Sequence, residues 1–288
     1  MILSLLLAAL APLDEFSDHW HDGKAEVSGY RFEVQRYGES RVGRAVTIYV
    51  TEPFSESARV KSDDADDAFD ALKFNFLRDF PTGIYDYDTM TSLFVRTKDF
   101  SPLKTTYSSA EWCGHIFEQL IPRGDAIEHT LHSYVENEST AGKLARPEDG
   151  IEEERLFVLL RGLRGPYLVP GVVREVPFLP GAFHRRLTHT PAAWRTASIQ
   201  RVDVVGVTDV ADKRFEAIEY VVRVGDERTG RFFVELDAPH RILRWSWTRP
   251  DGKPYEGAHS GELTATERMR YWKLNRGADA PALSRLGF

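Results

Sequence analysis

Apolar and polar residues alternate along most of this chain, and this period of two constrains the fold more than any other feature. Tyr30, Phe32 and Val34, for example, are each followed by a charged or amide side chain. Similar alternation is found over residues 46–50, 72–76, 218–224, 232–236 and 243–247. Because successive side chains of a strand point to opposite faces, the pattern predicts half-buried strands. Strands that follow one another through short turns favour a mainly β fold over doubly wound and TIM-barrel folds.

One segment departs from this period. Residues 150–163 carry acidic side chains first and arginines last, and Asp149 and Glu152 have the spacing of a capping box. These features predict one substantial helix, with Leu156 and Leu160 on its apolar face. A helix with one apolar face needs a partner. We therefore expect a curved antiparallel sheet, or half-barrel, with this helix packed on it.

The order of the expected elements predicts a single β-rich domain over residues 20–276. It consists of a β half (20–136), a helical connection (137–189) and a second β half (190–276). A chain of 288 residues can form one large β domain. The sequence leaves open whether the two halves share one sheet.

Residues 1–11 are apolar and end in Ala9-Leu10-Ala11, a small-residue pattern that signal peptidases favour. They predict a signal peptide and therefore an exported protein, periplasmic or secreted. A helix packed on the domain is the alternative. No other segment is apolar for the roughly 20 residues that a spanning helix needs, so we expect a protein that does not span the membrane, although it could touch the envelope peripherally.

The net charge and the cysteine content limit which partners the chain can bind and which bonds it can form. The net charge of −7 argues against a nucleic-acid partner, because binding a phosphate backbone depends on clustered cations. The single cysteine, Cys113, excludes an intramolecular disulfide. Because an exposed thiol oxidises readily in an oxidising compartment, we expect Cys113 to be covered in an exported protein.

The residues that could carry chemistry gather on one predicted β-hairpin. Strands near residues 112–120 and 127–135, joined by a turn at residues 123–124, place Cys113 across from Tyr134 and His115 across from His132. All four point away from the core face of the hairpin. On the core face, Glu118 opposes His129, which we interpret as a structural hydrogen bond rather than an acid/base couple.

Four interpretations of this patch remain open. Cys113, His115 and His132 are residue types that zinc or copper prefers, although no fourth ligand is identifiable. Cys113 could instead be a nucleophile with a histidine base. The patch could also line a ligand cavity, with Tyr134, Tyr85 and Tyr87 as aromatic walls. The fourth interpretation, that the histidines pair across strands and the cysteine fills space, carries the most weight. We expect no cofactor, with zinc as the one exception that the residue types allow.

Two stretches of the chain resemble known families. The run from Tyr30 to Tyr134, especially residues 80–88, 111–115 and 132–134, resembles a family of uncharacterised bacterial envelope proteins, some of which are labelled septum formation inhibitor Maf. Residues 232–236 and 241–245 look like strands of the half-barrel found in periplasmic lipoprotein carriers. The second resemblance implies a concave apolar sheet partly covered by a helix, which holds acyl chains in the carriers.

These observations lead to one expected function and two alternatives. The first is an exported binding protein for a lipidic or other apolar molecule of the cell envelope. The second is a thiol- or metal-dependent hydrolase that uses Cys113, His115 and His132, with Tyr134 as a polar stabiliser. The third is a structural protein of the envelope, for which no sequence feature speaks directly.

Overall fold

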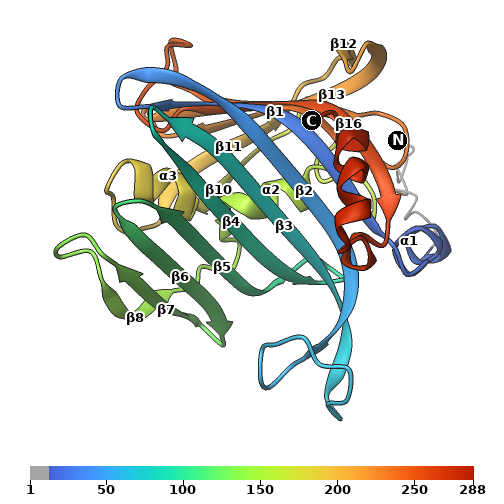
Figure 1. Cartoon of the computed structure of the whole chain (residues 1–288), viewed down its shortest axis with the longest axis horizontal. Coiled ribbons are helices and arrows are strands. Elements are labelled where there is room, and N and C mark those ends of the chain that lie inside the picture. Colours follow the sequence, from blue (N-terminus) through green and yellow to red (C-terminus); the bar gives the residue numbers. More distant parts are fainter. Residues whose placement is uncertain (1–12) are drawn as a thin grey trace, which may run out of the picture.

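The computed structural model describes residues 13–288, which form one large, curved, open sheet (Figure 1). The predicted signal peptide, residues 1–11, lies outside the described residues. The strands are β1 (Ala25–Arg36), β2 (Glu39–Ser55), β3 (Ala68–Thr82), β4 (Tyr85–Arg96), β5 (Pro102–Glu111), β6 (Gly114–Arg123), β7 (Ala126–Ser133), β8 (Thr140–Ala145), β9 (Ile151–Glu152), β10 (Val173–Leu179), β11 (Arg195–Arg201), β12 (Gly206–Val210), β13 (Lys213–Val224), β14 (Arg228–Glu235), β15 (Ile242–Thr248) and β16 (His259–Met269). The mainly β prediction is confirmed.

Helical segments are short. They are the α-helices α1 (Leu13–Trp20), α2 (Leu156–Leu159) and α3 (Ala182–Leu187), and the 3₁₀ segments η1 (Glu153–Arg155), η2 (Tyr271–Lys273) and η3 (Gly277–Leu286). Within residues 13–288 no helix is both long and apolar enough to cross a membrane.

The strand order shows how the two β halves are joined. Strands β1 to β8 form a meander in which each strand pairs with the next. β1 also pairs with β16, and the sheet continues through β15, β14, β13, β11 and β10 to β9, with β12 attached to β13. All of these pairs are antiparallel except that of β9 with β10. Both halves therefore contribute to a single sheet, which the sequence had left open.

The main core fills the concave side of the sheet, where α2 lies behind the strands in Figure 1. Phe157 of α2 packs on Phe74 and Phe76 of β3 and on Trp245 of β15, with ring centroids 4.7–5.5 Å apart. These aromatic contacts come from strands far apart in the sequence. The central helical segment thus holds the two halves of the sheet against each other.

The helix predicted over residues 150–163 is shorter than expected. Residues 151–152 form β9 and pair with β10, so regular helical structure covers only residues 153–159. The predicted capping box is absent: Glu152 at the N-cap makes no side-chain cap, and Asp149 pairs with Arg174 at 2.8 Å. Gly162, with a positive φ of 62°, follows soon after the helical residues and lets the chain turn away.

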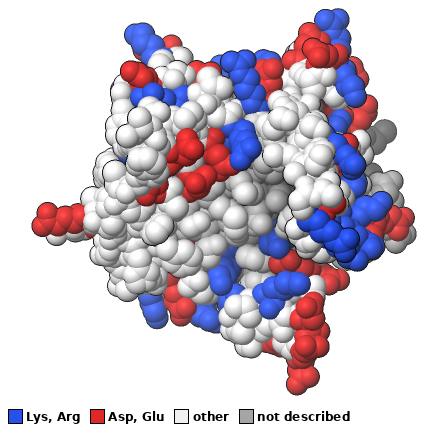
Figure 2. Space-filling model, viewed as in Figure 1, with Lys and Arg blue, Asp and Glu red and all other residues white. Residues whose placement is uncertain are grey.

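The convex side of the sheet is partly covered by a segment near the C-terminus. Segment η3 lies across β1 and β16 (Figure 1), and Leu286 packs against Val27 and Ile48. Gly29 of β1 permits this approach, since a Cβ there would lie 2.1 Å from the carbonyl oxygen of Leu286. On the face shown in Figure 2, acidic and basic side chains are interspersed, without a broad surface of one sign.

Candidate functional site

Cys113 lies at the tip of a hairpin rather than within a strand. β5 ends at Glu111 and β6 begins at Gly114, so Trp112 and Cys113 form a two-residue turn. The predictions of a strand through this stretch and of a covered thiol are wrong, because Cys113 is exposed. Its backbone N–H donates to Oε2 of Glu111 at 2.6 Å, and the contact with that carboxylate raises the pKa of the thiol. A raised pKa disfavours the thiolate that nucleophilic catalysis needs.

The β6–β7 hairpin turns at Gly124 and Asp125, one residue later than predicted. His132 consequently faces Phe117, and the predicted pairing of His115 with His132 is wrong. The register moves by two residues, so the direction of every side chain is preserved. Both histidines are exposed on the outer face, as the alternation predicts.

The predicted ligand set for zinc is not assembled. Within the described part of the chain, no group of three or more His, Cys, Asp or Glu side chains is arranged to hold a metal ion. Cys113 lies in the β5–β6 turn, His115 on β6 and His132 on β7, and their side chains do not converge on one point.

Tyr85, Tyr87 and Tyr134 do come together with two further aromatic residues, Tyr37 and Trp112. Tyr37, in the β1–β2 turn, shares hydrogen bonds with Tyr87 (2.9 Å) and Tyr85 (3.3 Å), and Trp112 stacks on Tyr85 at 6.2 Å. Tyr134 donates to Glu111 at 2.6 Å. We call these five aromatic residues the aromatic rim, since they lie at the hairpin turns along one end of the strands. The sequence signal that could have identified Tyr37 is an aromatic residue next to a glycine in a tight turn, as in Tyr37-Gly38.

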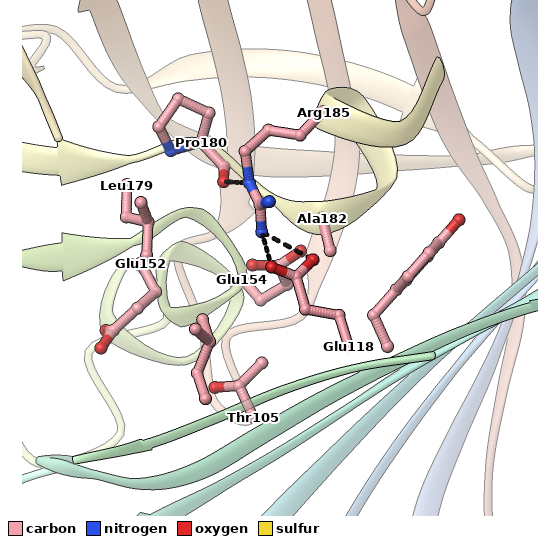
Figure 3. A pocket seen from close by; sticks show the side chains of 10 residues that line it. Thr105, Glu118, Glu152, Glu154, Leu179, Pro180, Ala182 and Arg185 are labelled. Carbon is pink, nitrogen blue, oxygen red and sulfur yellow. Dashed lines mark hydrogen bonds and ion pairs between the residues drawn. The ribbon is translucent and has the colours of Figure 1, made fainter. Parts of the chain in front are cut away.

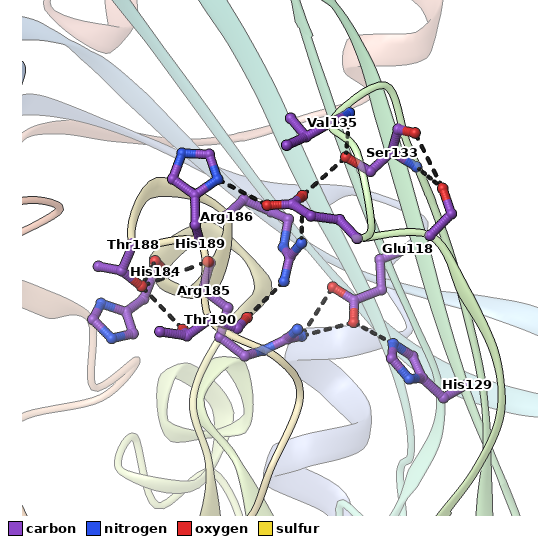
Figure 4. A network of polar contacts seen from close by, with 12 residues as sticks. Glu118, His129, Ser133, Val135, His184, Arg185, Arg186, Thr188, His189 and Thr190 are labelled. Carbon is purple, nitrogen blue, oxygen red and sulfur yellow. Dashed lines mark hydrogen bonds and ion pairs between the residues drawn. The ribbon is translucent and has the colours of Figure 1, made fainter.

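A buried ion-pair network lies on the core face of the β6–β7 hairpin (Figure 4). Glu118 faces Leu131 rather than His129, so the predicted opposition is wrong, but Nε2 of His129 lies 2.6 Å from Oε1 of Glu118, and the hydrogen bond expected from the sequence is present. Arg185 of α3 donates to both carboxylate oxygens of Glu118 at 2.9 Å. Burial raises the pKa of Glu118, but the hydrogen bond with His129 and the charge of Arg185 outweigh it and hold the pKa below its usual range. These contacts fix α3 to the sheet.

Two further buried carboxylates, those of Glu153 and Glu154, lie beside this network. Glu153 is hydrogen-bonded to Arg228 and to the N–H of Gly181, whereas burial and the neighbouring charge of Glu153 raise the pKa of Glu154 to about 7. Figure 3 shows Arg185 reaching from α3 to Glu118, with Glu154 close by. The cavity between them measures only about 10 Å³. That volume suits about one water molecule and excludes a substrate.

A concave site much larger than this cavity lies at the opposite end of the strands from the aromatic rim. We call it the α1 groove, because α1 forms one wall; the others come from residues 160–166, the end of β11, β13, β14 and the loop 236–240. Its volume is about 860 Å³. Most of its lining is apolar, including Phe16, Trp20, Leu160, Leu163, Ile218 and Val234. β1 runs from Glu26 near this groove to Arg36 at the rim, a span of roughly 30 Å.

A buried ion pair fixes the inner wall of the groove. Arg161 donates two hydrogen bonds to the carboxylate of Glu26, at 2.7 and 3.1 Å, and two more to the carbonyl oxygens of Pro239 and His240. Burial opposes ionisation of Glu26, yet Arg161 and the contact with His19 lower its pKa to about 2. Both partners are charged at neutral pH. Arg161 therefore joins β1, the helical segment and the loop 236–240 into one rigid wall.

Comparisons with known proteins add little. No family model matches this chain, and no curated protein matches it. A solved structure that resembles it is the crystal structure of a DUF1089 family protein from Pseudomonas aeruginosa, at 1.80 Å resolution. The two share 10% sequence identity and a TM-score of 0.38, over 64% of this chain and 86% of the other. A likeness this distant assigns neither family nor function.

Proposed function

We propose that this chain is an exported binding protein for a lipidic or other apolar molecule of the cell envelope, and that the ligand occupies the α1 groove. One observation carries the proposal. The groove has a volume of about 860 Å³, is lined mostly by apolar side chains, and lies at the end of the curved sheet opposite the aromatic rim. Pockets that bind small organic molecules typically measure about 300–1,000 Å³ and combine an apolar lining with a few placed polar groups.

The packing around the groove supports a preformed site. Trp20, the last residue of α1, is buried and contacts Tyr49 of β2, with ring centroids 6.0 Å apart, so the helix wall is anchored to the sheet. Arg161 fixes the opposite wall through its bonds to Glu26 and to the loop 236–240. A ligand entering such a site orders few side chains, so little of its binding energy is lost to conformational entropy.

The proposal moves the ligand away from the residues that the sequence favoured. In the aromatic rim, the hydroxyls of Tyr85, Tyr87 and Tyr134 are already engaged in hydrogen bonds with Tyr37 and Glu111. The α1 groove offers a concave, mostly apolar surface on which a lipidic molecule could be removed from water. The lining, rather than the rim, is therefore where binding should respond to mutation.

The test uses the full chain and N-phenyl-1-naphthylamine, a neutral probe whose fluorescence rises in apolar surroundings. Replacing Ile218, whose side chain lines the groove on β13, by tryptophan fills part of the cavity. We expect Ile218→Trp to weaken probe binding at least about tenfold, a loss of about 1.4 kcal/mol.

Arg223→Trp is the matched control. Arg223 lies on the same strand, five residues further, and its exposed side chain points to the other face. It adds the same indole outside the groove, so probe affinity should equal that of the wild type. Absence of probe binding by the wild type, or equal binding by Ile218→Trp and the wild type, would refute the proposed function.

A further inference from the structure

Two carboxylates around the α1 groove, those of Glu26 and Glu235, are each matched by an arginine, whereas Asp18 of α1, which also lines the groove, is exposed to solvent. Arg161 is bonded to Glu26, as described above. Glu235 accepts two hydrogen bonds from the guanidinium of Arg241, at 2.6 and 2.7 Å. Each of these carboxylates is thus neutralised by an arginine, and neither offers a free charge to a ligand.

Arg201 is the exception among the arginines that line the groove. It is the last residue of β11 and pairs in register with Tyr220, another residue of the lining. Nη1 donates to the carbonyl oxygen of Leu168 at 2.9 Å, while Nε is buried without an acceptor. Among the side chains that the structure describes, those of residues 16–288, no carboxylate lies within ion-pair distance of Arg201. A half-buried guanidinium without a counter-charge is costly, and an anion would relieve that cost.

We propose that the ligand of the α1 groove is an anionic amphiphile, whose head group pairs with Arg201 while its apolar chain lies along the lining. This inference rests on the proposed function, since it assumes that the groove binds a ligand. The planar guanidinium suits a head group with two acceptor oxygens, a carboxylate or a phosphate monoester. The apolar side chains that line the groove for such a chain are Ile218 and Val234 on the sheet and Phe16 and Trp20 on α1.

Dodecanoate and 1-dodecanol test the inference, because they share a twelve-carbon chain and differ in head-group charge. Each is titrated below its solubility limit, at pH 8, against the full-length wild type and the variants Arg201→Gln and Arg201→Lys. We expect the wild type to prefer dodecanoate by about tenfold or more, the usual effect of one charge-assisted hydrogen bond. Arg201→Gln should lose that preference while binding dodecanol as the wild type does, and Arg201→Lys should keep part of it.

Arg223→Gln is the control, since it removes an exposed arginine outside the groove and should leave both affinities unchanged. Equal affinity of the wild type for the two ligands, or an unchanged preference in Arg201→Gln, overturns the inference but leaves the proposed function standing. Failure of the wild type to bind either ligand overturns both. If Arg201→Gln binds neither ligand, Arg201→Lys decides: a retained preference for dodecanoate supports the inference, and equal affinities overturn it.

Discussion

Replacing Glu118 by glutamine should destabilise the protein strongly, because it removes the negative charge at the centre of a buried network. Both Glu118 and Arg185 are only 2% exposed, and among the described side chains, those of residues 16–288, the carboxylate is the sole acidic partner of Arg185. Breaking one side of a buried ion pair costs about 3–5 kcal/mol, since the other charge stays buried and uncompensated. Typical domains have a total stability of about 5–15 kcal/mol, so the loss would be a large part of it.

Urea unfolding followed by tryptophan fluorescence measures this effect, and thermal unfolding should show a midpoint lower by about 6–10 °C, at about 2 °C per kcal/mol for a chain of this size. Glu128→Gln is the matched control: Glu128 lies on the same hairpin and pairs with Arg123, but both side chains are about half exposed. Loss of this exposed ion pair should lower the free energy of unfolding by less than about 1 kcal/mol. The double variant Glu118→Gln/Arg185→Gln should recover part of the stability, because no unpaired charge remains.

A loss below about 1 kcal/mol in Glu118→Gln, equal to that of Glu128→Gln, would refute this reasoning. It would mean that water reaches the network and solvates Arg185, in which case α3 is not fixed to the sheet by charge.

Two further predictions concern other ionisable groups. Because the pKa of Glu154 is raised to about 7, the folded chain keeps a proton that the unfolded chain releases, and stability falls as the pH rises from about 5 to 7. Glu154→Gln should remove this loss, raising the thermal midpoint relative to wild type more at pH 8 than at pH 5; equal differences at both values would contradict it. Cys113→Ser should leave stability and probe binding unchanged, whereas wild-type Cys113 should react with a maleimide without unfolding; a thiol that reacts only in denaturant would contradict its exposure.

The strands were largely predictable because their signal is local. Alternation over a few residues, as at Tyr30, Phe32 and Val34, reports the two faces of a strand without knowledge of its partners. The Glu118–His129 contact was predictable for the same reason, since an error of two residues in register preserves side-chain direction. The helix over residues 150–163 was overestimated, because residues 151–152 pair with β10 and the buried carboxylate of Glu153 forms an ion pair with the distant Arg228.

The α1 groove could not be predicted, because its walls come from segments far apart in the sequence. The pairing of β1 with β16 joins the two halves into one sheet, and only then do the walls meet, as shown by Phe16, Leu163, Ile218 and Pro239. The pattern around Cys113, by contrast, attracted attention because reactive residue types stood close together in the chain. In a β protein, closeness in sequence brings residues to the same hairpin but does not enclose a site.

Photochemical labelling tests the central claim most directly. The wild-type protein is exposed to a twelve-carbon fatty acid that carries a diazirine at the end of its chain, irradiated, digested and analysed by mass spectrometry. We expect labels in residues 16–20, 160–166 and 234–240, which form walls of the α1 groove, and their loss in Ile218→Trp. Labels concentrated at Tyr85 and Trp112 of the aromatic rim, or scattered over the surface and unaffected by Ile218→Trp, would contradict the claim.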